Sequence, residues 1–307
     1  MTFSVTILGS SSALPTSNRF PTAHLFNSNE RFFLIDCGEG TQIQLRRFHL
    51  RFGKINHIFI SHLHGDHYFG LYGLLSTYSL MGRKNPLHIY AHQELEQLLH
   101  CQFAENNLGF DIVFHKISKK THELIYEDKR LTVEAFPLKH RMAASGFLFK
   151  EKARELNIRK NIIQKYHLSL KDIQQIKLGA DYQTNDNRII PNKELTLPPY
   201  KQRAYAFCSD TAYLPELIQY LKDVDILYHE ATFAEDNKDI AEETGHSTAK
   251  QAAMIAKEAG VGKLLIGHFS SRYKNEKILE QEAREVFKNT EAVVEGREYK
   301  VELERLE

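Results

Sequence analysis

The segment Ser61–His67, which reads SHLHGDH, brings together four side chains able to bind a metal ion. The four are His62, His64, Asp66 and His67. They directly follow a short apolar run, Ile58–Ile60, that predicts a β-strand. In extended chain the two histidines separated by one residue point to the same side, and Gly65 then permits a turn toward a second position. Four ligands this close together suit two neighbouring metals better than one.

A dinuclear metal site needs further ligands, and three candidates follow other predicted strands. His140 comes after LTVEAFPLK, Asp210 after AYAFCS and His268 after KLLIG. Loops at strand ends converge on one edge of a sheet, so these positions are geometrically sensible. Taken singly each signal is weak, because a lone histidine there is as often a hydrogen-bonded surface residue. A lone aspartate before threonine is usually a turn or cap residue.

Short strands and helices alternate along both halves of the 307-residue chain, which predicts an α/β fold. The predicted strands are Phe3–Leu8, Arg31–Asp36, Ile58–Ile60, Leu87–Ala91, Ile112–Ile117, Leu131–Pro137, Ala204–Cys208, Ile226–His229 and Lys263–Ile266. The predicted helices are Leu71–Leu80, Pro215–Leu221, Ser247–Ala259 (capped by Ser247 or Thr248) and one near Glu276–Phe287.

Residues 150–203 have a different composition and predict an insertion, hereafter called the insertion. From Lys150 to Lys177 the chain has eight Lys or Arg residues against three acidic ones, an excess of five positive charges. The whole chain has a net charge of only +1, so any affinity for nucleic acid must come from such local placement. The alternative is a solvated basic helical excursion with no partner.

The N-terminus and the cysteines indicate the compartment. The start, MTFSVTILGS, lacks the basic region and long apolar run of a signal peptide, and we see no stretch that predicts a membrane span. Three widely spaced cysteines, Cys37, Cys101 and Cys208, suit a reducing environment rather than a disulfide framework. We therefore expect a cytoplasmic protein.

The motif HxHxDH is the signature of the metallo-β-lactamase superfamily, and the rest of the chain resembles the ribonuclease Z family within it. The matching stretches are LGSSSALPT, LIDCGEGTQIQ, SHLHGDHYFGL, LKHRMAASGF, CSDT, HEATF, TGHSTA and LIGHFSSRY, in family order. The resemblance implies an αβ/βα four-layer sandwich over residues 1–307, with the insertion as a tRNA-binding arm.

The resemblance also implies a ligand set and catalytic roles. One metal would be held by His62, His64 and His140, the other by Asp66, His67 and His268, with Asp210 bridging both. Two Zn²⁺ ions per chain are expected, and Mn²⁺ or Fe²⁺ also suit these ligands. The family pattern makes Asp66 the residue that orients the nucleophile.

The same family pattern makes His246 the proton donor to the leaving group, and Glu230 the residue that orients or tunes it. From the residues alone, Glu230 would be a solvated loop carboxylate and His246 a residue at a helix N-terminus.

Contacts to RNA are expected from the first loop and from the insertion. The expected residues are Arg19, Lys150, Lys152, Arg154, Arg159, Lys160 and Lys165. The chain departs from the family at two places. Phe20 follows Arg19 where asparagine is usual, and the insertion has no Gly-Pro stretch between Lys150 and Lys177.

The expected function is hydrolytic removal of the 3′ trailer from precursor tRNA by an endoribonuclease that leaves a 3′-hydroxyl on the tRNA. The resemblance further implies a homodimer, with no membrane or DNA partner. Two alternatives stay open: a metal phosphodiesterase for small or cyclic phosphodiesters, and a non-catalytic RNA-binding scaffold. The intact set of ligands disfavours the scaffold.

Overall fold

Buried strands build two seven-stranded sheets in the computed structural model, which describes residues 1–103 and 108–306. In order across the first sheet the strands are β16 (Glu298–Lys300), β1 (Phe3–Gly9), β2 (Ala23–Ser28), β3 (Arg31–Ile35), β4 (Ile55–Phe59), β5 (Leu87–Ala91) and β6 (Ile112–Lys116). The second sheet runs β15 (Thr290–Ala292), β14 (Lys263–Gly267), β13 (Ile226–Glu230), β12 (Ala204–Cys208), β9 (Ala144–Glu151), β8 (Leu131–Leu138) and β7 (Glu123–Glu127). Strands β3 to β6 are mutually parallel, as are β12 to β15.

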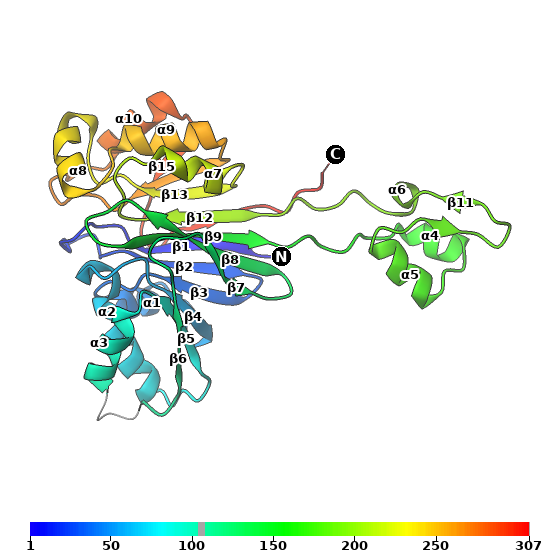
Figure 1. Ribbon diagram of the computed structural model, residues 1–307, viewed down its shortest axis with the longest axis horizontal. Coiled ribbons are helices and arrows are strands. Elements are labelled where there is room, and N and C mark those ends of the chain that lie inside the picture. The colour runs from blue at the N-terminus through cyan, green and yellow to red at the C-terminus, as the bar shows by residue number, and fades with distance from the viewer. Residues whose placement is uncertain (104–107, 307) are drawn as a thin grey trace. The chain divides into compact units, whose positions relative to one another are not determined.

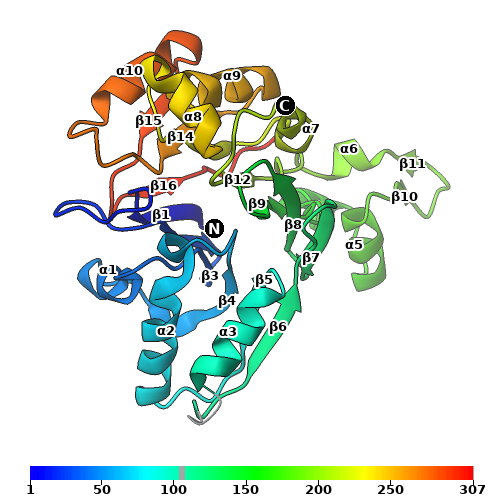
Figure 2. The ribbon, with the colours of Figure 1, turned by 60° about the vertical axis from the view of Figure 1, so that its left-hand side comes forward.

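Helices cover the outer faces of the two sheets, which gives four layers (Figures 1 and 2). On the side of the first sheet lie α1 (Thr41–Arg47), a 3₁₀ turn (Phe52–Lys54), α2 (Gly65–Leu80) and α3 (Glu94–Phe103). The second half of the chain supplies a 3₁₀ turn (Pro215–Leu217), α7 (Ile218–Leu221), another 3₁₀ turn (Glu235–Asn237), α8 (Lys238–Thr244), α9 (Ala249–Ala259) and α10 (Lys277–Val286). The expected αβ/βα four-layer sandwich is thus confirmed. No helix within the described ranges combines the length and apolarity that crossing a membrane requires.

Aromatic side chains fill the space between the two sheets. Phe26 of the first sheet contacts Phe149 of the second with ring centroids 4.7 Å apart, and stacks on Tyr205 at 5.6 Å. All three are buried. Large rings bury much apolar surface each, so this layer holds the two sheets together and fixes the edge where their loops meet.

A second compact unit consists of Glu151–Arg203 and the C-terminal residues from Glu302. It contains α4 (Lys160–Lys165), α5 (Leu170–Lys177), a hairpin of β10 (Tyr182–Gln183) and β11 (Ile189–Ile190), and α6 (Asn192–Leu195). Its small apolar cluster is formed by Ile162, Leu168, Ile176, Ile190 and Leu195. The insertion therefore has a hydrophobic cluster of its own.

A buried ion pair joins the two ends of the insertion. The guanidinium of Arg203 donates from Nε to Glu151 Oε2 (2.9 Å) and from Nη2 to Glu151 Oε1 (3.0 Å). Both side chains are at most 4% exposed. Burial alone would raise the pKa of Glu151, but the bonds from Arg203 and Arg154 lower it below its usual value. The pair closes the insertion where the chain leaves the sheet.

Replacing Glu151 with glutamine is expected to lower the free energy of unfolding by about 3–5 kcal/mol at pH 7, because the buried guanidinium of Arg203 loses the carboxylate that lies 2.9 Å away. Because the folded-state pKa of Glu151 is lowered, the stabilisation is complete above the unfolded pKa of about 4.3 and is lost as the pH falls through the folded value. Denaturant unfolding at pH 7 and pH 3 measures this, with the exposed Glu155→Gln as control. A Glu151→Gln deficit of equal size at both pH values would contradict the assignment.

Candidate metal centre

The sequence-predicted ligands all lie where strands of the two sheets end. His62 and His64 follow β4, and Asp66 and His67 form the first turn of α2. His140, Asp210 and His268 follow β8, β12 and β14. Backbone at His64 is still extended (φ −73°, ψ 143°), and the helix begins at the next residue. Parallel strands deliver their carboxyl ends to one edge of a sheet, so residues far apart in sequence meet there.

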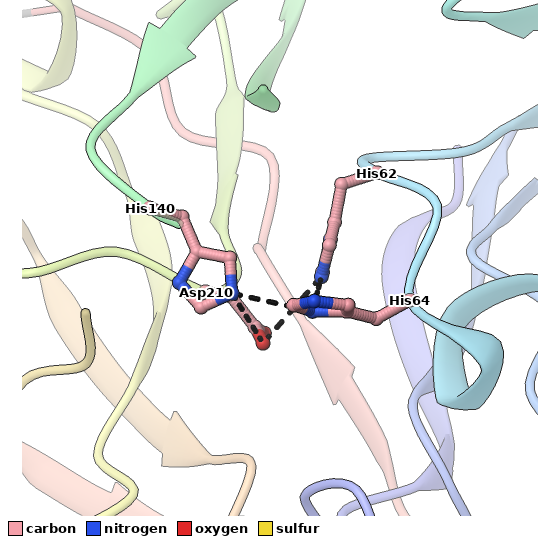
Figure 3. Close-up of side chains that lie close together, drawn as sticks. All are labelled: His62, His64, His140 and Asp210. Carbon is pink, nitrogen blue, oxygen red and sulfur yellow. Dashed lines mark hydrogen bonds and ion pairs between the residues drawn. The ribbon is translucent and has the colours of Figure 1, made fainter. Parts of the chain in front are cut away.

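The first group of ligand atoms comes from three histidines and one aspartate (Figure 3). His64 Nδ1 lies 3.0 Å from His62 Nε2 and 3.2 Å from His140 Nε2. Asp210 Oδ2 lies 3.5 Å from His62 Nε2 and 3.8 Å from His140 Nε2. Burial lowers the pKa of His62 to about 3, which favours the neutral imidazole that binds metals.

The second group lies on the other side of the same aspartate. Asp66 Oδ2 is 3.3 Å from His67 Nε2 and 3.5 Å from His268 Nε2. The second carboxylate oxygen of Asp210, Oδ1, is 3.3 Å from His67 Nε2 and 3.1 Å from His268 Nε2. Each oxygen of Asp210 thus faces one group, and the geometry gives a bridging carboxylate between two sets of donors.

The residues present fit a pair of divalent cations. His67 Nε2 and His268 Nε2 are buried, and although carboxylate oxygens of Asp66 and Asp210 lie near them, they form no hydrogen bond. Their other nitrogens are held: His67 Nδ1 by Asp36 (2.7 Å) and His268 Nδ1 by the hydroxyl of Thr232 (2.9 Å). Leaving a buried nitrogen unpaired costs free energy, whereas a metal ion would satisfy it. Outer partners that fix the second ring nitrogen are typical of histidine ligands.

His246 and Glu230 form a hydrogen-bonded pair beside these groups. His246 Nδ1 lies 2.8 Å from Glu230 Oε1. Glu230 is fully buried and also accepts from the backbone N–H of Thr211 and from the backbone and hydroxyl of Thr232. Burial alone would lower the pKa of His246, but the carboxylate of Glu230 raises it, to about 9. The bond to Glu230 leaves Nε2 of His246 available to a substrate.

Two carboxylates that support the site were not identified from the sequence. Asp36 ends the predicted strand Arg31–Asp36, and it accepts from Ser61 as well as from His67. Glu295 accepts from the N–H groups of Ser10 (3.1 Å) and Phe20 (2.8 Å), and so closes the base of the loop 10–20. Neither stands in a spacing that marks it out from the other acidic residues.

The loop 10–20 reaches the metal ligands. The backbone N–H of Ala13 donates to Asp66 Oδ2 at 2.8 Å, which orients that carboxylate. Arg19, predicted to bind RNA, donates from Nη2 to the carbonyl of Tyr273 at 2.7 Å. It also lies over the ring of Phe269, so at least part of its guanidinium holds the loop.

The cations of the insertion differ in exposure. Lys150, Arg159, Lys160 and Lys165 are exposed, whereas Lys152 and Arg154 are half-buried. Arg154 donates to Glu151 at 2.6 Å. The exposed members are the better candidates for contacts with a polyanion.

A cleft of about 540 Å³ opens over the metal-ligand groups. Its walls include His64, Asp66, His140, Asp210, His246 and His268. Titratable groups, paired carboxylates and unpartnered imidazole nitrogens therefore face one cavity, which is the arrangement expected of a hydrolytic active site.

Comparison with known proteins supplies the family. A family model described as "Anti-Pycsar protein Apyc1" matches residues 3–291, which is nearly the whole chain. A protein named ribonuclease Z from Phocaeicola vulgatus is 50% identical over 290 residues, which cover 94% of this chain and 94% of that one. The chain belongs to the ribonuclease Z family.

Solved structures agree with this ribonuclease Z assignment. Human tRNase Z, short form, matches with a TM-score of 0.70 at 26% identity, covering 96% of this chain and 98% of that one. A metallo-β-lactamase fold protein, YhfI from Bacillus subtilis, matches with a TM-score of 0.68 at 19% identity over 98% and 100% of the two chains. The second likeness bears on the fold alone, which is the metallo-β-lactamase fold.

Removal of the bridging carboxylate tests the metal centre. Purified wild-type protein is expected to hold close to two divalent metal ions per chain by elemental analysis, and Asp210→Ala to lose much of this content, because one side chain faces both donor groups. The exposed Asp239→Ala is the matched control and should keep the wild-type content. One metal per chain in the wild type, unchanged in Asp210→Ala, would contradict a dinuclear centre.

Proposed function

We propose that this chain is a zinc-dependent endoribonuclease that removes the 3′ trailer from precursor tRNA and leaves a 3′-hydroxyl on the tRNA. The observation that carries the proposal is the complete set of seven donor residues, arranged in two groups about Asp210, in a ribonuclease Z family chain. The human protein of similar structure is named a tRNase Z. The alternative of a non-catalytic scaffold has no support in such an intact site.

Two Zn²⁺ ions would be held by the two donor groups. His62, His64 and His140 would hold one ion, while Asp66, His67 and His268 would hold the other, and Asp210 would bind both. When bound, such a pair supplies a nucleophile at neutral pH and offsets the negative charge of the scissile phosphate. Imidazole and carboxylate donors suit zinc, and they also accept Mn²⁺ or Fe²⁺.

In this proposal Asp66 acts on the attacking water. Its Oδ2 is oriented by the N–H of Ala13 and lies in the cleft between His67 and His268. A carboxylate fixed in this way can align a water molecule with the phosphorus and accept the proton that the water loses.

In this proposal His246 acts on the leaving group. The carboxylate of Glu230 fixes the ring through Nδ1 and stabilises its protonated form, while the ring borders the cleft. The departing 3′-oxygen of the tRNA needs a proton, and the Nε2–H of His246 can donate it. Glu230 is itself fully buried, so its role is to position and charge the imidazole.

His246→Ala is expected to keep its metal content and to cleave precursor tRNA about 10²–10⁴-fold more slowly, the usual contribution of general acid catalysis. The defect should shrink with bis-p-nitrophenyl phosphate, because p-nitrophenolate leaves without a proton. The exposed His100→Ala is the control. An equal defect on both substrates would instead assign His246 to positioning of the phosphate.

The insertion is proposed to bind the folded tRNA away from the cut. Its five excess positive charges lie outside the metal motifs, and Arg159, Lys160 and Lys165 are exposed on or next to α4. When lysine and arginine bind phosphates they release counterions, so such binding weakens with salt. A small phosphodiester would gain nothing from these residues.

Deleting residues 152–178, which keeps Glu151 and its bonds to Arg203, and closing the gap with a short Gly/Ser linker is expected to raise the KM for precursor tRNA and to flatten its salt dependence, while hydrolysis of bis-p-nitrophenyl phosphate persists. Each phosphate that the variant no longer neutralises should lower the log–log salt slope by roughly 0.7–0.9. Replacing Arg159, Lys160 and Lys165 with glutamine should reproduce part of the effect. The matched control replaces the exposed Lys222, Lys257 and Lys288.

If the deletion variant cleaves precursor tRNA as well as the wild type does, the insertion does not bind RNA. That result would favour small phosphodiesters as the substrate. Loss of both activities together with the metal would instead show that the insertion is part of the core.

The proposal also includes the cytoplasmic location and the homodimer that the family resemblance implies. Analytical ultracentrifugation measures the assembly.

A further inference from the structure

A second cavity, of about 550 Å³, lies beside the metal cleft. One wall is the turn that follows β8, and the other is the segment that leads into α7. Its lining includes Leu138, Lys139, Arg141, Met142, Leu214 and Tyr220. The volume is in the usual range for a small-molecule subsite, and none of the roles assigned above uses this cavity.

The two cavities share His140 and Arg141. His140 belongs to the first donor group, so the second cavity begins one side chain away from the metal centre. A substrate whose phosphate occupies the cleft can therefore extend past Arg141 into this space. Whatever fills it is attached directly to the reacting group.

The guanidinium of Arg141 lies where the two cavities meet, and hydrogen bonds fix its position. Its Nη2 and Nε donate to the backbone carbonyl of Glu243 at 2.9 and 3.3 Å. Because this partner is a neutral carbonyl, the bonds hold the guanidinium in place without neutralising its positive charge. Lys139, which is exposed on the same wall, adds a second positive charge. The mouth of the cavity is therefore suited to a phosphate.

The rest of the lining is mostly apolar, and its one carboxylate, Glu216, is exposed to solvent. The ring of Tyr220 is fixed by stacking on Phe136, with centroids 5.1 Å apart and planes at 17°. Leu214 and Met142 are half-buried beside it. A nucleobase favours apolar and aromatic walls, and the flexible thioether of Met142 adapts to bases of different size. Apolar walls with cations toward the metal cleft match one nucleotide of an RNA chain.

The hydrogen bonds decide which nucleotide this is. The segment Glu243–His246 carries the proposed proton donor, and it is bonded to the cavity wall twice: through Arg141, and through His140 Nδ1, which lies 2.7 Å from the carbonyl of Gly245. The oxygen that His246 would protonate is the 3′-oxygen of the last nucleoside kept on the tRNA. The wall therefore adjoins that nucleoside, rather than the trailer.

We propose that this cavity binds the 3′-terminal nucleoside of the tRNA portion, with Arg141 at the scissile phosphate and the base between Met142, Leu214 and Tyr220. This inference rests on the proposed function and names the subsite within it.

Abasic substrates test the proposal with the full-length, metal-loaded protein. One precursor tRNA carries an abasic residue at the last tRNA position, and a second carries it at the first trailer position. Removing the base at the last tRNA position removes its contacts with the cavity wall, and should lower kcat/KM of the wild type roughly 5- to 100-fold. The abasic trailer position should have little effect. Cleavage of the unmodified precursor by the wild type is measured first, so a failure of the proposed function shows itself before any variant is compared.

Variants of the wall complete a double-mutant cycle. Met142→Trp fills the cavity and Leu214→Ala widens it, so both variants should cleave the intact precursor more slowly than the wild type does. On the substrate that is abasic at the last tRNA position, their kcat/KM should be close to that of the wild type. Leu80→Trp, at the exposed end of α2, is the control and should keep the full abasic penalty. Arg141→Ala should lower kcat/KM on both substrates and reduce the salt slope by roughly 0.7–0.9.

An abasic penalty of equal size in wild type, Met142→Trp and Leu214→Ala would overturn the proposal. So would coupling of these variants to the trailer position instead. If Met142→Trp does not fold, the abasic penalty measured in Leu214→Ala is sufficient to test the proposal.

Discussion

The buried carboxylate of Asp210 is the interaction on which the rest of the site depends. Its two oxygens face two separate sets of imidazoles, and the side chain is only 3% exposed. A charge in such a place is tolerated only with close opposite charge, from protonated imidazoles or from metal cations. The partners follow three strands (β4, β8 and β14) or lie on α2, and these strands belong to both sheets, so the aromatic layer between the sheets indirectly fixes the centre.

Around Asp210, hydrogen bonds to the second ring nitrogen fix the orientation of three histidine ligands. Asp36 holds His67, Thr232 holds His268, and the carbonyl of Gly245 holds His140. Thr232 also donates to Glu230, so the ligand His268 and the pair formed by Glu230 and His246 share one hydroxyl. A change at that threonine would therefore disturb the proposed metal ligand His268 and the proposed proton donor His246 together.

The sequence indicated nine strands of the two sheets but missed β2, β7, β9, β15 and β16, and it indicated the helices around the site less accurately. Strands such as Leu87–Ala91 and Ala204–Cys208 were predicted with their observed bounds, because continuous buried runs have a clear signature. The helix predicted at Leu71–Leu80 begins at Gly65, since the ligands Asp66 and His67 occupy its first turn and hide the apolar pattern there. The helix predicted at Pro215–Leu221 is a 3₁₀ turn followed by one short α-turn.

For the site itself, spacing alone indicated the four residues of the SHLHGDH segment. The ends of predicted strands indicated the other three ligands only weakly, and resemblance to the family was needed to assign them and to identify His246 and Glu230. His140, Asp210 and His268 each look ordinary in sequence, and only the converging strand ends bring them together. Asp36 and Glu295 escaped notice because their partners, Ser61 and Phe20 among them, are neighbours in space through loops. Hydrogen bonds of this kind leave no periodic signal in a sequence.

The most direct measurement of the central claim is the position of the cut. Purified protein loaded with zinc is incubated with an end-labelled precursor tRNA, and the new termini are mapped and chemically identified. The account predicts one cut at the 3′ end of the mature tRNA, with a 3′-hydroxyl on the tRNA and a 5′-phosphate on the trailer, abolished by chelation and restored by zinc. Cleavage at scattered sites, a 2′,3′-cyclic phosphate terminus, or activity that survives chelation would contradict it.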